Sequence, residues 1–582
     1  MNIDLRHVPF SRNGSYLAFS ILPAAGNSSD SEESRSERPE GLYLRSVHGG
    51  SHAVQPNGRM ALIEPIVDER PIPYEIRVEP SGIDLLTVRG TLSLCIAEPY
   101  VIRVRGEGVG MRMTFNAHLG DYAIPSANRR FQINSFGYLT QLMLTPLMGS
   151  WKVDSPWNGT GAGRLVAELL PDEDSEVCEG AVEEFTSVWR PRSYDETFEE
   201  CRVNLEDDFK QFLRQMPGFS PKLPAGYAEA RRLAAFVNWS AFVEPQGHFL
   251  RPAMLMSKNW MNNVWSWDHC FNAMALTYHK QVMAWDQLML MFDMQDDFGG
   301  LPDCYNDRSV VWNFCKPPIH GWVLGWMMER TQFIRGDQIR QIYGPLCRWT
   351  EWWFHYRDDD HDGIPQYHHG NDSGWDNATP FKVGVPLESP DLCAFLVLQM
   401  ETLAKLAAKI RNYEEAESWQ RRSEELLQKM LAHFWQGDHF AAMRSGDHLL
   451  ADTDSLFLYL PLILGKRLPL AVRNDLINGL MRPGRFLTDY GLATESLNSP
   501  DFDPDGYWRG PIWAPAVMIL VEGLAACGET EMARDLARRF CDTVVRSGFA
   551  ENFDPRTGEG LRDQAYTWTS SVFLVLAREY LS

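Results

Sequence analysis

The spacing of apolar residues changes once along this chain, near residue 195, and the change limits the folds open to it. From about residue 10 to 190, short alternations such as Tyr74–Val78 are separated by Gly, Pro and Asn. This period of two predicts antiparallel strands in a β-sandwich, with a mobile loop at Gly26–Glu40. Beyond residue 195, apolar residues recur every three or four positions, which predicts helices. We therefore expect an α+β multidomain protein with a β-sandwich domain (1–195), a helical linker (196–224) and a helical catalytic domain (225–582).

In the helical part, the spacing of apolar residues predicts about twelve helices, and the connections between them alternate between long and short. Their expected ranges are 225–242, 267–279, 281–295, 318–335, 337–357, 390–410, 413–435, 453–464, 469–481, 511–527, 529–547 and 564–581. We see no fixed internal repeat, so a solenoid is not indicated. Long links are expected after helices one, three, five, seven and nine, and a shorter eleventh link holds Glu551. This alternation is typical of an (α/α)6 toroid, in which outer helices feed inner ones through loops at one end.

Polar and aromatic residues gather in these odd-numbered links. The first link ends at Asp268, the third holds Asp303 and Lys316, the fifth Asp376, the ninth Trp508 and Arg509, and the eleventh Glu551. All of them are therefore expected on one rim of the toroid. The fifth and eleventh links are half a turn apart, so Asp376 and Glu551 should face each other across its mouth.

Two carboxylates are what the hydrolysis of a glycosidic bond needs, one acid for the leaving oxygen and one base for water. Asp376 follows Gly374 and Trp375, and partial desolvation by the indole would raise its pKa, as a general acid requires. Glu551 precedes a turn, where a more polar setting would keep a base ionised. The alternatives are a turn-forming or helix-capping aspartate and a solvated loop glutamate.

Rings and hydrogen-bonding charges occur together in two further segments, Trp265–His269 and Gly506–Trp513. One interpretation is a sugar subsite, in which rings stack on a pyranose while Asp268 and Arg509 bind its hydroxyl groups. The other is a buried Asp–Arg pair that joins two loops. We favour the subsite, because so many rings at a rim exceed what packing requires.

Asp358, Asp360 and Asp362 have the D-x-D-x-D-G spacing of a calcium loop. The twelfth position of such a loop would be His369 rather than the usual glutamate. A bound calcium ion and a carboxylate-rich turn both remain open. No redox cofactor is expected.

Charge and cysteine usage restrict partners and location. The net charge of −22 disfavours nucleic acid and anionic membranes as partners. The ten cysteines form no regular framework, which favours reduced thiols in a cytoplasmic protein. The N-terminal residues lack the charged segment followed by an apolar one that is typical of a secretion signal, and no apolar segment approaches the length of a membrane-spanning helix. A small carbohydrate is the expected partner, and the oligomeric state stays open.

From residue 225 to 582 the chain resembles the inverting (α/α)6 glycosidases of glycoside hydrolase families 63 and 37. The resemblance is closer to bacterial family 63 enzymes, which include mannosylglycerate and glucosylglycerate hydrolases. It rests on the order of several motifs: Trp267-Asp268, Lys316–Pro318, Asp360–Gly363, Ser373–Asn377, Glu388–Leu392, Tyr507–Trp513 and Glu551–Phe553. Trehalases are similar at Ser373–Asp376, but they carry Lys-Tyr-Asp after the glutamate where this chain has Asn552-Phe553-Asp554.

This resemblance implies site roles and a reaction. Asp376 would be the general acid and Glu551 the general base of an exo-acting, inverting α-glycosidase that acts on a small α-glucoside or α-mannoside. The residues implied or expected to bind the sugar are Trp267, Asp268, Lys316, Trp375, Tyr507, Trp508, Arg509 and Trp513. Two rival functions are a sugar isomerase or epimerase working through His269, His320 and His368, and a noncatalytic carbohydrate-binding protein.

Overall fold

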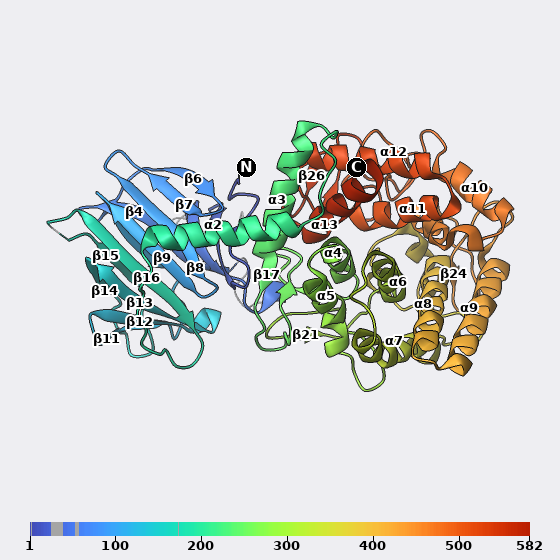
Figure 1. The fold of residues 1–582 in the computed structure, drawn as a ribbon, viewed down its shortest axis with the longest axis horizontal. Helices are drawn as coiled ribbons and strands as arrows, with labels where there is room; N and C mark the ends of the chain where they lie inside the picture. Colours follow the sequence, from blue (N-terminus) through green and yellow to red (C-terminus); the bar gives the residue numbers. More distant parts are fainter. Residues whose placement is uncertain (2, 25–38, 53–57, 173) are drawn as a thin grey trace.

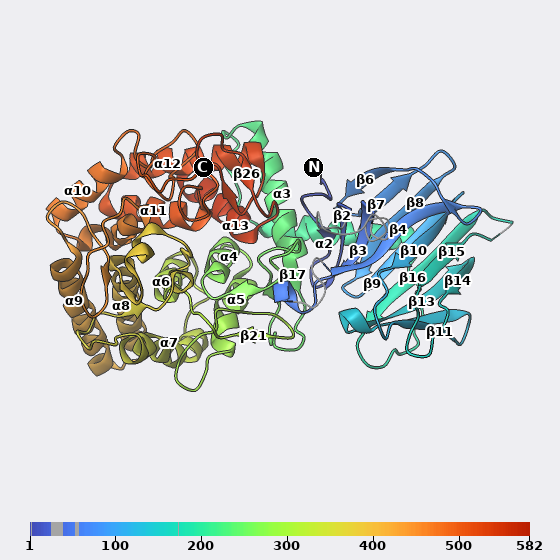
Figure 2. The same cartoon turned by 180° about the vertical axis from the view of Figure 1, so that it is seen from behind.

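The structure is a computed structural model that describes residues 1, 3–24, 39–52, 58–172 and 174–582. Most of the loop expected at Gly26–Glu40 lies outside these residues. Figure 1 shows two parts side by side, stacked sheets at one end and a ring of helices at the other, and Figure 2 shows the same division from behind.

The N-terminal part contains two eight-stranded sheets, in which all paired strands are antiparallel. The first consists of β1 (Phe10–Ser11), β2 (Leu17–Leu22), β3 (Gly41–Ser46), β4 (Arg59–Val67), β5 (Arg70–Pro71), β10 (Gly110–Phe115), β15 (Val166–Leu170) and β14 (Ser150–Asp154). The second consists of β11 (Tyr122–Ser126), β12 (Arg130–Ser135), β13 (Thr140–Met148), β16 (Val177–Phe185), β9 (Val101–Glu107), β8 (Thr91–Glu98), β7 (Gly82–Leu86) and β6 (Glu75–Glu79). The predicted antiparallel sheets are confirmed. Leu92 and Leu94 of β8 are buried while Ser93 is partly exposed, as a period of two requires.

A long helix, α2 (Phe198–Gln215), begins at a capping box in which Thr197 and Glu200 satisfy each other's backbone N–H groups. Its apolar face, which includes Phe198, Leu205 and Phe209, is buried. The helix contacts strands β8 and β9 on one side and helix α3 (Ala225–Ala241) on the other. The segment expected as a linker therefore packs against both parts of the molecule.

The helical part is a ring of two layers, as an (α/α)6 toroid predicts. The inner elements are α4 (Asp268–Leu276), α6 (His320–Arg330), α8 (Pro390–Lys409), η6 (Leu456–Arg467), α11 (Ala514–Cys527) and α13 (Thr567–Leu576). Each contacts the next, and α13 returns to α4, which closes the ring. The outer helices are α3, α5 (Gln281–Asp293), α7 (Asp337–Tyr356), α9 (Tyr413–Phe434), α10 (Leu470–Leu480) and α12 (Thr530–Ser547). A short π-helical turn, η7 (Ala577–Leu581), extends α13.

One inner element differs from its expected form. The helix expected at 453–464 is a 3₁₀ helix over Leu456–Arg467, interrupted at Gly465, whose φ is +56°. Pro461 lies inside it and has no N–H to donate. The residues around it are nevertheless almost all buried, so packing holds this segment in the ring where regular α-helical bonding is broken.

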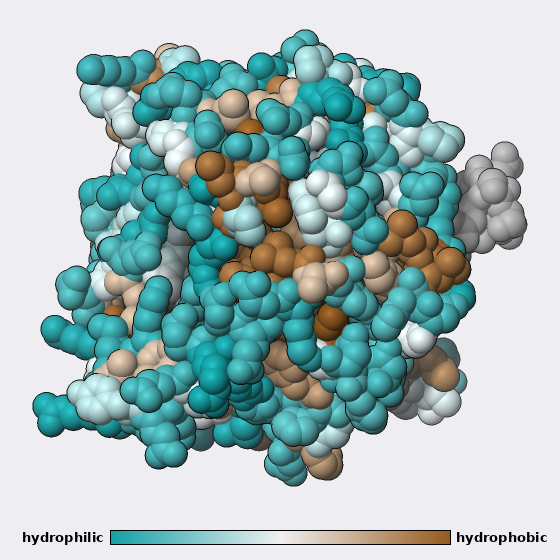
Figure 3. All heavy atoms as spheres, turned by 90° about the vertical axis from the view of Figure 1, so that its right-hand side faces the viewer, coloured by the Kyte–Doolittle hydropathy of each residue, from teal (hydrophilic) through white to brown (hydrophobic). Residues whose placement is uncertain are grey.

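The outer helices divide their side chains between core and solvent. Helix α9 buries Trp419, Leu426 and Met430 on one face, and its charged residues lie on the other. Figure 3 views this end of the ring, where hydrophilic residues cover most of the surface and hydrophobic ones gather near the middle. Among the helices that the structure describes, none has both the length and the apolar character needed to cross a membrane.

A buried charged cluster joins the sheets to the ring. His48, which follows β3, lies 2.7 Å from Asp307 of the ring and 3.6 Å from Glu184 of β16. The ring of Tyr16 stacks on His48 with the centroids 4.0 Å apart. Burial alone would lower the pKa of His48, but Glu184 and Asp307 raise it to about 9. The imidazole is therefore a cation at neutral pH.

We expect Asp307→Asn to destabilise the protein by about 1.5–3 kcal/mol near neutral pH, because the His48 cation loses its hydrogen-bonded carboxylate and keeps only Glu184, at 3.6 Å, as a buried partner. The His48 pKa is raised from 6.5 to about 9, so its stabilisation is complete below pH 6.5 and is lost as the pH rises through 9. Thermal unfolding should therefore show a large loss of Tm at pH 6.5 and a smaller one at pH 9.5. The exposed pair Lys210–Asp207 supplies the control, since Asp207→Asn should change Tm little at either pH. An equal loss at both pH values would contradict this assignment.

Candidate active site

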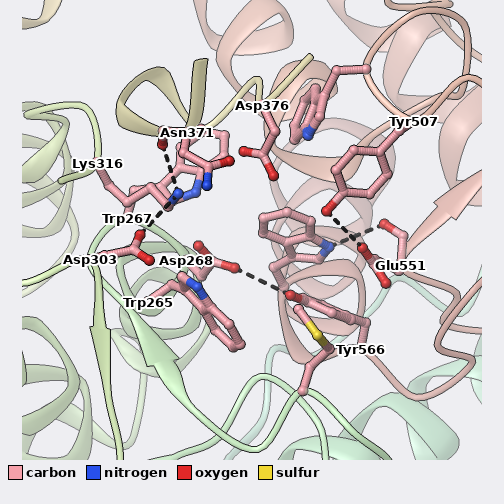
Figure 4. Close-up of a pocket in the computed structure, with 14 residues that line it drawn as sticks. Trp265, Trp267, Asp268, Asp303, Lys316, Asn371, Asp376, Tyr507, Glu551 and Tyr566 are labelled. Carbon is pink, nitrogen blue, oxygen red and sulfur yellow. Dashed lines mark hydrogen bonds and ion pairs between the residues drawn. The ribbon is translucent and has the colours of Figure 1, made fainter. Parts of the chain in front are cut away.

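Five of the six links that follow outer helices meet at one cavity of about 170 Å³, and the link after α9 contributes no lining residue. Its lining comes from the links α3–α4, α5–α6, α7–α8, α10–α11 and α12–α13 and from the start of α13. The lining residues are Met261, Trp265, Trp267, Asp268, Asp303, Lys316, Asn371, Gly374, Asp376, Tyr507, Trp508, Glu551, Tyr566 and Trp568. Figure 4 shows the carboxyl groups of Asp268, Asp376 and Glu551 directed toward a common space. The convergence expected from the link pattern is present.

The turn that carries Asp376 depends on a glycine. Gly374 ends a short 3₁₀ helix, η4 (Gly370–Ser373), with φ +72°, which disfavours a side chain. A Cβ there would also lie 2.6 Å from the indole of Trp267. The buried carboxylate of Asp372 anchors the turn, since it accepts the backbone N–H groups of His368 and Cys315 at 2.9 and 3.1 Å. The result directs Asp376 into the cavity.

Asp376 is partly exposed to the cavity. In the amide orientation that satisfies both ends of Asn371, its nitrogen lies 2.9 and 3.0 Å from the two carboxyl oxygens of Asp376. Burial raises the pKa of Asp376, and nearby Lys316 opposes the rise. The upward direction agrees with the expectation of a desolvated acid.

Glu551 follows α12 and is only 4% exposed. Its Oε1 lies 3.4 Å from the hydroxyl of Tyr507, which is placed to donate to it. Burial and the nearby carboxylate of Asp563 raise the pKa of Glu551 to about 8. The expectation of a polar setting that keeps this residue ionised is therefore wrong for the free site, because the chain folds Glu551 beneath aromatic rings instead of leaving it in an open loop.

Asp268 begins α4 at the base of the cavity, and burial raises its pKa to about 8. The hydroxyl of Tyr566 approaches its Oδ1 at 3.5 Å. Lys316 is the single lysine or arginine among the described lining residues; its Nζ lies 3.0 Å from Asp303 and 2.7 Å from the carbonyl of Asn371. Burial would lower the pKa of Lys316, but Asp303 and Asp376 raise it. The cavity thus offers several donors and acceptors close to the two proposed catalytic carboxyls.

The expected aromatic walls are only partly as predicted. Trp267 and Trp508 line the cavity. Trp375 and Trp513, also expected there, are not among the lining residues but pack against Trp508, with ring centroids 4.7 and 4.0 Å away. They support the wall from behind, because the inner ring needs large buried side chains at this level.

Arg509 also differs from its expected place. It does not line the cavity, and the ion pairs of the described residues do not include one between Arg509 and Asp268. Its backbone instead closes a turn, where its carbonyl accepts the N–H of Asp503 at 2.8 Å. From this loop, Tyr507 and Trp508 line the cavity and Arg509 does not.

Several lining residues were not singled out from the sequence for the site. Tyr566 and Trp568 flank the first residue of the last inner helix. The rule that residues directly before inner helices reach the rim would have found Tyr566 but not Trp568, which lies within the first turn of the helix. Met261 carries no such signal, since it lies in an irregular stretch of the first link.

The histidines expected for an isomerase do not lie in the cavity. His269 and His320 are buried with ring centroids 5.3 Å apart, and His368 contacts Asp359 at 3.0 Å. None of the three lines the cavity, so the geometry does not favour a sugar isomerase or epimerase.

The predicted calcium loop brings ligand oxygens of Asp358, Asp360 and Asp362 within 4.8 Å of one another. His369, at its twelfth position, instead accepts the N–H of Asn371 through Nδ1 at 3.1 Å. The loop therefore lacks its usual last ligand, and bound calcium stays a prediction.

Known proteins are similar to this chain in sequence or in fold. Residues 261–569 match the family described as mannosylglycerate hydrolase MGH1-like glycoside hydrolase domain. The chain is 23% identical over 397 residues to a mannosylglycerate hydrolase of Thermus thermophilus, covering 54% of this chain and 94% of that protein. It is 36% identical over 86 residues to a glucosylglycerate hydrolase of Mycolicibacterium hassiacum, covering 15% and 19% of the two chains. A bacterial glucoamylase solved with acarbose covers 100% of this chain, which covers 94% of the glucoamylase chain, with TM-score 0.63 and 10% identity. This last likeness shows the fold alone and spans both the sheets and the ring.

Proposed function

Because the chain belongs to the mannosylglycerate hydrolase MGH1-like glycoside hydrolases, we propose that it is an exo-acting, inverting α-glycosidase for a small glycosyl-glycerate type substrate. The sugar would be α-linked glucose or mannose. The observation that carries the proposal is that Asp376 and Glu551, from links far apart in sequence, line the same cavity.

In this proposal Asp376 protonates the leaving oxygen and Glu551 removes a proton from the attacking water. The water oxygen bonds to the anomeric carbon on the face opposite the departing oxygen as the glycosidic bond breaks, so the configuration is inverted. Within the described residues, no hydrogen bond or ion pair joins the two carboxyl groups directly, which is compatible with a sugar and a water between them. Asp268 and Lys316 would bind sugar hydroxyls, and Trp267 and Trp508 would pack against the ring. The reaction requires no cofactor.

The size of the cavity supports a small substrate. Its volume of about 170 Å³ is below the roughly 300–1,000 Å³ of pockets that hold drug-sized ligands. One sugar with a short leaving group suits such a space better than the interior of a long glycan. The names of the mannosylglycerate and glucosylglycerate hydrolases to which the chain is similar support glycerate as that leaving group.

A substrate panel tests the proposal. Purified protein should release glucose or mannose from α-glucosylglycerate or α-mannosylglycerate faster than from α-linked disaccharides, and time-resolved NMR should show the β-anomer first. Release of the α-anomer first would contradict inversion. Binding to these compounds without turnover would contradict hydrolysis itself.

The pH profile follows from the site's electrostatics. The pKa of Glu551 is raised to about 8 and that of Asp376 is also raised. At low pH Glu551 is protonated and the base is missing; at high pH Asp376 is ionised and the acid is missing. We expect kcat/KM, measured from pH 4 to 10, to follow a bell whose optimum lies above the pH range in which ordinary carboxyl groups titrate, with limbs that belong to the coupled pair. An optimum at pH 4–5 would contradict the raised pKa values.

We also propose a cytoplasmic location. Every described cysteine is a free thiol, and all except Cys347 are buried, a pattern suited to a reducing compartment.

A further inference from the structure

Four side chains outside the cavity converge from separate segments of the ring. Asp362 lies in the link after α7, Glu388 in the two-residue strand β23 (Leu387–Glu388), His433 near the end of α9 and His448 after β24 (Met443–Arg444). One ligand atom from each lies within 4.8 Å of all the others. Figure 1 shows β24 beside α8 and α9 at the edge of the ring.

The side chains face one another at short range. The Nε2 atom of His433 lies 2.7 Å from Oε2 of Glu388. The Nε2 atom of His448 lies 3.3 Å from Oδ2 of Asp360, 3.8 Å from Oε2 of Glu388 and 3.9 Å from Oδ2 of Asp362. Four ligands around a tetrahedral zinc ion, at bond lengths of about 2.0–2.2 Å, stand roughly 3.3–3.6 Å apart. Small side-chain movements would therefore bring all four atoms onto one ion.

Glu388 supplies an independent observation that points to a ligand. Its side chain is completely buried, yet Oε1 has no hydrogen-bond partner among the described residues. A buried carboxylate oxygen without a partner is costly. His433 satisfies only Oε2. A cation that Glu388 binds through both carboxylate oxygens would remove this cost.

The donor set selects the kind of metal. Two imidazole nitrogens with two carboxylates match divalent zinc and similar transition metals. Calcium and magnesium prefer all-oxygen sites, and no thiolate is present among these four side chains to favour a soft metal. His448 is 41% exposed, so an ion can reach the site from solvent.

We propose that Asp362, Glu388, His433 and His448 form a four-coordinate site for a divalent transition-metal ion, with zinc the best match. Glu388 follows the Asn371–Asp376 turn and Asp362 precedes it in the chain. The ion therefore ties both flanks of that segment to α9 and to the loop after β24. The site is independent of the glycosidase proposal and is tested by binding alone.

Zinc binding to the full-length protein is the test. After dialysis against a chelator, calorimetric titration with Zn²⁺ should show one tight site, and thermal unfolding should show a Tm that rises with added Zn²⁺. His448→Gln should weaken binding at least tenfold and abolish the Tm rise. His448 is exposed, so this variant should fold normally. His439→Gln changes an exposed histidine that pairs with Asp438 and should behave as wild type.

Cobalt gives a spectroscopic check. Co²⁺ added to the chelated protein should produce the visible absorption bands of four-coordinate cobalt, and Zn²⁺ should remove them; His433→Gln and His448→Gln should each lose the bands. The proposal is overturned if Zn²⁺ does not bind, if His448→Gln binds it like wild type, or if Ca²⁺ at equal concentration displaces it.

Discussion

Asp376→Asn is expected to lower kcat on α-glucosylglycerate or α-mannosylglycerate by about 10²–10⁴-fold, because an amide cannot protonate the leaving oxygen. The change preserves shape, and Asn371 can still contact the new side chain from 2.9 Å through its amide oxygen or nitrogen. KM should change little, since the lost interaction belongs to the transition state. Steady-state kinetics with release of the sugar measures this directly.

The leaving group separates a general acid from a residue that merely shapes the cavity. A glycosyl fluoride or a dinitrophenyl glycoside leaves without protonation, so Asp376→Asn should lose much less activity on such substrates than on the glycerate. Asp452→Asn, at an exposed aspartate in the same ring, should retain wild-type rates on both. An equal loss on activated and unactivated substrates would remove Asp376 from the role of acid.

Glu551→Gln should lower kcat by a similar factor, about 10²–10⁴, for a different reason. Glutamine cannot accept the proton of the attacking water. Because that step is needed whatever leaves, the loss should be equally large on the glycerate and on activated substrates. Measurement of both substrates with both variants therefore distinguishes the acid from the base.

The glutamine side chain keeps the volume of the buried glutamate, and the N–H of Trp568 can still donate to the backbone carbonyl of residue 551, now 3.3 Å away. We therefore expect Glu551→Gln to fold normally, as judged by circular dichroism and Tm. Glu559→Gln, an exposed glutamate in the following hairpin, is the matched control and should be fully active. Near-normal turnover by Glu551→Gln would exclude it as the base.

Local patterns in the sequence predict much of the fold. The helix α7 expected at 337–357 is present over Asp337–Tyr356, and α9 expected at 413–435 over Tyr413–Phe434. Periodicity succeeds here because one side of each helix faces the core and the other faces water. It fails at Leu456–Arg467, where an all-apolar run hides the effect of Pro461 on backbone bonding.

The order of the links in the sequence also predicts that Asp268, Asp376 and Glu551 lie close together. The protonation states of these carboxyl groups could not be predicted in the same way. The raised pKa of Glu551 depends first on burial and then on Asp563, and the depth of burial results from rings contributed by other links. Sequence spacing contains no measure of that depth.

The sequence alone predicts the division into sheets and helices, the closed ring, and the set of links that hold the reacting groups. Each of these predictions depends on periodicity and connection length along a continuous stretch of chain. Only tertiary contacts place Trp375 and Trp513 behind Trp508, keep Arg509 out of the cavity and gather Glu388 with His433 and His448. These features depend on the distances between side chains from distant segments and on how far those side chains are removed from water. Both quantities are set only when the chain folds.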